Sequence, residues 1–85
     1  MKVKFTRSAE RDMEELGSVV AARMMKKILW HAENNEKEVP LPLSGRFKEF
    51  YKWRVGDWRV IYSMDRTKGI LVIEMVGHRR EIYRK

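Results

Sequence analysis

The run "YKWRVGDWRVIY", Tyr51 to Tyr62, constrains the fold more than any other part of this chain. Apolar and polar residues alternate on both sides of Gly56-Asp57, which is the pattern of two strands that each bury one face. A glycine at the first central position suits the type II′ turn that joins the two strands of a hairpin. The run therefore predicts a tight β-hairpin in which Arg54 lies directly opposite Arg59.

The two faces of this hairpin differ in chemistry. One face carries the cations Lys52, Arg54 and Arg59. The other face carries aromatic and aliphatic side chains, namely Tyr51, Trp53, Val55, Trp58, Val60 and Tyr62. Like charges that face each other in a sheet cost about 0.2–1 kcal/mol per pair, whereas a phosphate between two arginines turns repulsion into attraction. We predict an open phosphate-binding face; the alternative is a solvated face on which arginine stems cover apolar surface.

The rest of the sequence predicts helices before this hairpin and one strand after it. Helical spacing of apolar residues precedes and follows Gly17, and two prolines exclude a helix between Asn34 and Gly45. The predicted elements are a strand at Val3–Phe5, a helix over "TRSAERDMEEL", a helix from Ser18 to about Asn34, and strands at Arg46–Val55, Trp58–Met64 and Ile70–Val76. We expect one α+β domain over residues 1–85: an antiparallel sheet of about four strands (β-α-α-β-β-β) with an N-terminal helical hairpin packed on one face.

The charge of the chain is large and unevenly distributed. The formal net charge is +7. Residues 1–43 hold eight Lys and Arg against seven Asp and Glu, whereas residues 44–85 hold eleven against five, so the excess lies in the half that contains the hairpin. Such clustering favours a polyanionic partner. With no cysteine, two histidines, and neither a signal peptide nor an apolar run of membrane-spanning length, we expect a cytoplasmic protein without a cofactor, a bound metal or a membrane partner.

Several segments, taken together and in order, resemble the RelE/ParE superfamily of bacterial and archaeal toxins. They are "AERDMEEL" after the first strand, Gly45, "YKWRVGDWRVIY" and "VGHRREIY", so the resemblance covers the whole chain. The RelE branch, as the resemblance implies, consists of ribosome-dependent endoribonucleases that cut mRNA in the A site and so inhibit translation. As the resemblance implies, the 2′-hydroxyl of the RNA is the nucleophile that attacks the phosphodiester, and we expect the enzyme to need no metal ion. The resemblance also implies a cognate antitoxin that forms a hetero-oligomer with the toxin.

The resemblance assigns site residues one by one. The basic and tyrosine positions of the family correspond to the predicted catalytic residues Lys52, Arg54, Arg59, Arg79 and Tyr83. Lys52, Arg54 and Arg59, together with His78 and Arg80, are predicted to bind RNA. The best-known members have lysine where this chain has Arg54, and an arginine is always protonated. The general base would then be Lys52, Tyr83 or His78.

Two other functions fit parts of the same pattern. A ParE-like toxin inhibits DNA gyrase and cleaves no RNA, and "RVGDWRVIY" resembles segments of both branches. A noncatalytic nucleic-acid binder would also carry clustered cations. The presence of all five basic and tyrosine positions in one chain favours the RNA-cleaving branch.

Overall fold

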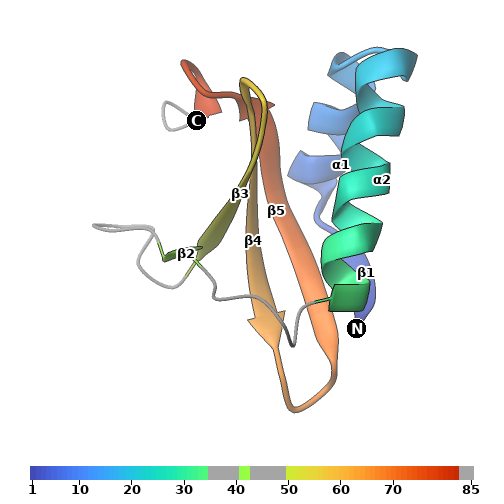
Figure 1. Cartoon of the computed structure of the whole chain (residues 1–85), viewed down its shortest axis with the longest axis vertical. Coiled ribbons are helices and arrows are strands. Elements are labelled where there is room, and N and C mark those ends of the chain that lie inside the picture. The colour runs from blue at the N-terminus through green and yellow to red at the C-terminus, as the bar shows by residue number, and fades with distance from the viewer. Residues whose placement is uncertain (35–40, 43–49, 83–85) are drawn as a thin grey trace.

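The structure, a computed structural model, describes residues 1–34, 41–42 and 50–82. Within these ranges the chain forms two helices and a five-stranded sheet, and both helices lie on one face of the sheet (Figure 1). In chain order the elements are β1 (Lys2–Phe5), α1 (Arg7–Glu15), α2 (Ser18–Asn34), β2 (Leu41–Pro42), β3 (Tyr51–Val55), β4 (Trp58–Asp65) and β5 (Ile70–His78). The predicted α+β class, with a helical hairpin on one face, is confirmed.

The sheet has the strand order β1-β5-β4-β3-β2. Strands β2 to β5 pair in antiparallel fashion, but β1 pairs parallel to β5, with Phe5 opposite Ile73. The prediction of a wholly antiparallel sheet is therefore wrong for β1. Parallel neighbours need a long crossover, and the two helices that follow β1 provide one. The short strand β2, which pairs Leu41 with Lys52, lies in a segment predicted as a connector.

The β3–β4 hairpin has the predicted register. Arg54 pairs with Arg59, and Trp53 pairs with Val60. Gly56 has a φ of +62°, while Asp57, like every other non-glycine residue that the structure describes, has no positive φ. A positive φ at the first central position alone is the signature of a type II′ turn, so the predicted turn type agrees with the observed backbone.

The core lies between the helices and the apolar face of the sheet. Met24 and Ile28 of α2 are completely buried there. From the sheet the core includes Trp53, Val55, Val60, Tyr62, Leu71, Ile73 and Val76. Met25 and Leu29 of the same helix are exposed, because α2 turns them away from the sheet. Within the described ranges, neither helix combines the length and the apolar character needed to cross a bilayer.

Helix α1 protects the edge of β5 beyond the point where β1 ends. Thr6 caps the helix by accepting the N–H of Ala9, and its hydroxyl donates to the carbonyl of Glu74. Further along, the buried carboxylate of Asp12 accepts the N–H of Val76 at 2.9 Å. Side chains of α1 thus replace the ladder partners that β1 would have supplied to β5.

Replacement of Asp12 by alanine should lower the free energy of unfolding by about 1–3 kcal/mol, because it leaves the buried N–H of Val76 without this acceptor. Asp12→Asn keeps an acceptor oxygen and should cost less. Glu14→Ala, on the exposed side of the same helix, removes the same charge and serves as the control. Urea denaturation measures all three variants; an equal loss in Asp12→Ala and Glu14→Ala would show that the buried bond contributes nothing.

Candidate active site

Three of the predicted cations share the sheet face that points away from the helices. Arg54 lies directly opposite Arg59, and Lys52 lies opposite Ile61. Because paired residues in a ladder point to the same side, Lys52, Arg54 and Arg59 lie on one face. The side chain of Arg54 is exposed, while Lys52 and Arg59 are half-buried. The hairpin therefore presents its cations together, as its alternation predicts.

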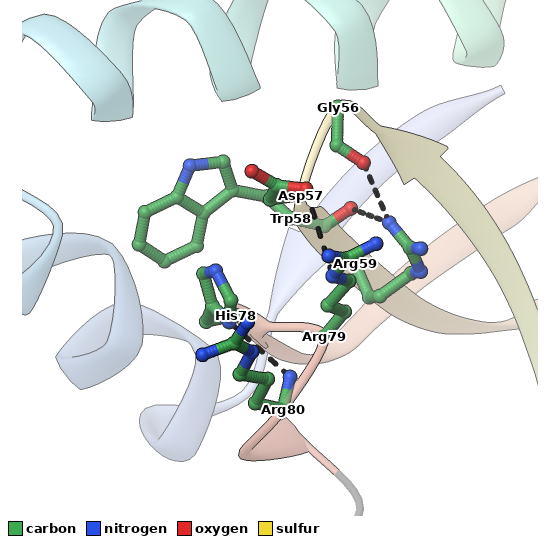
Figure 2. A network of polar contacts seen from close by, with 7 residues as sticks. All are labelled: Gly56, Asp57, Trp58, Arg59, His78, Arg79 and Arg80. Carbon is green, nitrogen blue, oxygen red and sulfur yellow. Dashed lines mark hydrogen bonds and ion pairs between the residues drawn. The ribbon is translucent and has the colours of Figure 1, made fainter.

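Arg59 is anchored to the hairpin turn. Its Nη1 donates to the carbonyl oxygens of Gly56 and Trp58, both at 2.8 Å (Figure 2). These two bonds hold the guanidinium near the turn and partly offset its repulsion with Arg54, because carbonyl oxygens carry partial negative charge. A guanidinium held in this way meets a ligand in a fixed orientation, which reduces the entropic cost of binding.

Arg79 reaches the same turn from the end of β5. Its backbone N–H donates to the carbonyl of Asp57 at 2.8 Å, and its Nε lies 3.6 Å from Oδ1 of Asp57. The two side chains are 52% and 64% exposed, so this ion pair contributes little to stability. A phosphate could displace Asp57 from Arg79 at low cost. The turn thus brings Arg59 and Arg79 together, although they are far apart in the sequence (Figure 2).

His78 lies on the other side of the sheet. It pairs with Trp58 in the β4–β5 ladder, and the two rings meet edge to face at 5.5 Å. Its Nδ1 accepts the backbone N–H of Arg80 at 3.2 Å, so the neutral ring carries its proton on Nε2. The structure therefore does not bring His78 onto the face of Arg59. Arg80 is exposed beyond the strand, and Tyr83 lies outside the described residues.

Gly77 and Ile82 belong to the same face, although neither was expected to be part of the site. Gly77 pairs with Arg59, and a Cβ at Gly77 would come within 3.1 Å of the Ile82 Cδ1 atom. Ile82 is completely buried. The chain after β5 therefore turns back onto the cationic face and packs against a position that has room only because it lacks a side chain. The glycine in "VGHRR" is the only sequence signal for this contact.

Replacement of Gly77 by valine should force Ile82 away from the sheet and cost about 1–3 kcal/mol of stability, as overpacking usually does. The N–H of Glu81, which donates to the His78 carbonyl, should then exchange faster with solvent. Adding Ile82→Ala to Gly77→Val makes room for the valine and should recover part of the stability. Amide hydrogen exchange of residues 79–82 is measured in the unmodified chain, in Gly77→Val and in the double variant. Unchanged protection of these amides in Gly77→Val would rule out the packing of Ile82 against Gly77.

Two further turn residues were missed by sequence reasoning. Asp57 was interpreted only as a turn former, yet it holds Arg79 through its carbonyl and its carboxylate. Trp58 was interpreted as a core residue, yet its carbonyl helps to anchor Arg59. Every residue has a backbone carbonyl, so residue type does not predict which carbonyl will accept a hydrogen bond. Only the carboxylate of Asp57 could have indicated from the sequence that the turn binds an arginine.

Chemically, this end of the sheet is suited to an anion with several oxygens. Arg54, Arg59 and Arg79 each present a planar fork of donors, which matches phosphate geometry. Fixed positive charge is also the means by which proteins stabilise negative charge that develops in a reaction. The arrangement can therefore bind a phosphodiester and favour a more highly charged form of it.

Comparison with known proteins gives a consistent result. The family model described as ParE toxin of type II toxin-antitoxin system, parDE, matches residues 3–83. Toxin RelG of Mycobacterium tuberculosis is 29% identical over 98% of this chain and 95% of its own length. The toxin–antitoxin complex RelBE2 from the same organism contains a chain with a TM-score of 0.82 and 27% identity, covering 92% of this chain and 90% of that one. The isolated Escherichia coli RelE toxin, at 22% identity, shares the fold with a TM-score of 0.74 over 91% of this chain and 82% of its own.

The family model, the relatives and the shared fold thus place this chain in the RelE/ParE superfamily of toxins. The match over nearly the whole chain shows that this protein belongs to the ParE toxin family of type II toxin–antitoxin systems.

Proposed function

We propose that this toxin is an endoribonuclease that cuts mRNA in the ribosomal A site and thereby inhibits translation. The observation that carries the proposal is the direct opposition of Arg54 and Arg59, with Arg79 reaching the turn that anchors Arg59. Its relatives include toxins named RelG and RelE, and this similarity favours the RNA-cleaving branch over the gyrase-inhibiting branch. The proposed partners are mRNA, the ribosome and a cognate antitoxin.

The proposed reaction is attack of the RNA 2′-hydroxyl on the adjacent phosphodiester, without a metal ion. It needs removal of the hydroxyl proton, stabilisation of the charged phosphorane and protonation of the leaving 5′-oxygen. Arg54 and Arg59 would stabilise the phosphorane, because preorganised positive charge often lowers the barrier more than any other single effect. Arg79 would stabilise the charge that develops on the leaving 5′-oxygen, which then takes its proton from water.

Proton removal falls to Lys52 or Tyr83 in this scheme. Arg54 stays protonated and cannot serve as the base. His78 is the third candidate, but its pairing with Trp58 turns it away from the face of Arg59. Tyr83 could also orient the 2′-hydroxyl or stack on a base, both of which are common uses of an aromatic ring in RNA recognition.

Primer extension on mRNA in a translating extract tests the proposal. Discrete cuts that appear with the toxin and disappear when ribosomes are omitted are expected. The second candidate function is inhibition of DNA gyrase, which the ParE family model favours. Uncut mRNA together with stalled gyrase supercoiling would support this second function; uncut mRNA with normal supercoiling would leave a noncatalytic binder.

A further inference from the structure

The ring of His78 holds the chain at the point where it leaves β5. Its Nδ1 accepts the backbone N–H of Arg80 at 3.2 Å (Figure 2). The backbone carbonyl of His78 accepts the N–H of Glu81 at 2.9 Å. A side-chain acceptor that takes the N–H two residues later forms the kind of turn that aspartate and asparagine often make. His78 therefore supplies the acceptors for two successive N–H groups of the turn after β5.

This turn carries Arg79 to the end of the sheet where Arg59 is anchored. The N–H of Arg79 donates to the carbonyl of Asp57, and the ring of His78 packs edge to face against Trp58 at 5.5 Å. The side chain of Arg79 is exposed, and its ion pair with Asp57 contributes little. The position of this guanidinium thus depends more on the backbone of the turn than on contacts of the side chain.

The ring of His78 can accept the N–H of Arg80 only while it is neutral. An imidazolium carries a proton on both ring nitrogens, so its Nδ1–H would point at the N–H of Arg80. Histidine is the side chain that ordinarily changes charge between about pH 5 and 8. Lowering the pH through this range therefore removes an acceptor from the turn.

Charged groups from several segments surround the ring. They are Asp12 and Glu15 of α1, Asp57 of the β3–β4 turn, and Arg79, Arg80 and Glu81 beside the ring. Asp12, Glu15 and Glu81 line a hollow of about 330 Å³ together with His78. Glu15 and Glu81 are exposed and can turn to accept the N–H groups of an imidazolium, whereas the two arginines oppose its charge. The hollow thus offers the protonated ring other acceptors.

We propose that His78 is a positioning residue for Arg79. Its neutral ring holds the turn that presents this arginine to a phosphate group, and protonation of the ring releases the turn. In the released state the imidazolium donates to carboxylates of the hollow, and the N–H of Arg80 loses its acceptor. The role in RNA cleavage rests on the proposed function, whereas the effect on phosphate binding does not.

A fluorescein-labelled 2′-O-methyl oligouridylate, which has no free 2′-hydroxyl to attack its own backbone, tests the proposal with the whole chain. Fluorescence anisotropy should give an affinity roughly three- to tenfold lower at about pH 5.5 than at about pH 7.5, the loss expected when one hydrogen bond that holds the site is removed. The direction of the change is informative. A ring that only gained positive charge would bind RNA more tightly at the lower pH.

Two amide variants of similar size separate the acceptor from the charge. The side-chain oxygen of His78→Asn can replace Nδ1 as the acceptor and does not titrate, so this variant should bind well at both pH values. The amide of His78→Gln lies where Nε2 was and should bind weakly at both. The difference between the two variants should vanish when Arg79→Ala is added, because it acts through this arginine. His31→Asn removes the other histidine and should keep the pH dependence.

The amide proton of Arg80 gives a measurement that needs no RNA. Its NMR chemical shift should change with the same midpoint as the ring protons of His78, and should stay constant over this range in His78→Asn. An Arg80 amide that does not follow the ring would overturn the proposal. So would probe affinity that rises at the lower pH, equal binding by the asparagine and glutamine variants, or no probe binding at the higher pH.

Circular dichroism checks that each variant is folded. Failure of the proposed function has a different signature from failure of this inference. If the chain cuts no mRNA but the pH dependence of probe binding is found, the proposed function fails and the role of His78 stands. If mRNA is cut but probe binding does not depend on pH, the role of His78 fails and the proposed function stands.

Discussion

Replacement of Arg59 by alanine should slow ribosome-dependent mRNA cleavage by about 10²–10³-fold, the usual loss when one preorganised donor to a developing oxyanion is removed. Arg59 is the central cation of the site, since it faces Arg54 across the hairpin and Gly77 across the β4–β5 ladder. Its bonds to the turn carbonyls fix its position before the substrate arrives. Primer extension under single-turnover conditions measures the rate of cutting.

Two variants separate this effect from general loss of charge or of folding. Arg66→Ala removes one exposed cation from the loop between β4 and β5 and should leave cleavage unchanged within about twofold. Arg59→Lys keeps the charge but loses the planar fork, so a loss of activity in this variant would point to geometry. Urea denaturation checks the contribution of Arg59 to stability. A folded Arg59→Ala variant that cuts at the normal rate would remove Arg59 from the mechanism.

Replacement of Trp53 by alanine should lower the free energy of unfolding by about 3–5 kcal/mol, as loss of a large buried aromatic side chain usually does. The Trp53 ring stacks on His31 of α2 at 4.2 Å and on Tyr62 of β4 at 3.9 Å, and the residue is 6% exposed. It therefore joins the helical layer to the sheet directly behind the cationic face. Since small domains are stable by only about 5–15 kcal/mol, this variant should be close to unfolding.

Trp30→Ala is the matched control for this prediction. Trp30 lies on the same helix as His31 but is half exposed, so its removal should cost less than about 1 kcal/mol. Trp53→Phe keeps an aromatic ring in the stack and should lie between the two. Urea denaturation provides the comparison. Equal losses in Trp53→Ala and Trp30→Ala would show that the stack does not hold the two layers together.

The hairpin was predictable because its information is local. Strict alternation assigns Lys52 and Arg54 to one face and Trp53 to the other. A two-residue turn at Gly56-Asp57 then allows a single pairing register, which is the register observed. The helices were predictable for the same reason, since apolar residues recur at helical spacing and Gly17 interrupts the pattern between α1 and α2. The spacing between residues along the sequence decides which face of a helix or strand each side chain lies on.

Contacts between distant segments were not predictable in this way. The parallel pairing of β1 with β5 depends on where the helical crossover returns the chain, and Asp12 could accept the N–H of Val76 only after α1 had packed along that edge. His78 was predicted to bind RNA with the other cations, and only its pairing with Trp58 showed that it faces the other way.

The sequence by itself determined which residues form the cationic face, because strand alternation and a two-residue turn act over neighbouring residues. Only the tertiary structure decided how that face is completed. Arg79 and Ile82 reach it from the end of β5 by contacts with Asp57 and Gly77. Such contacts depend on the positions of whole strands in space, which are set by packing across the core and not by the pattern of any one segment.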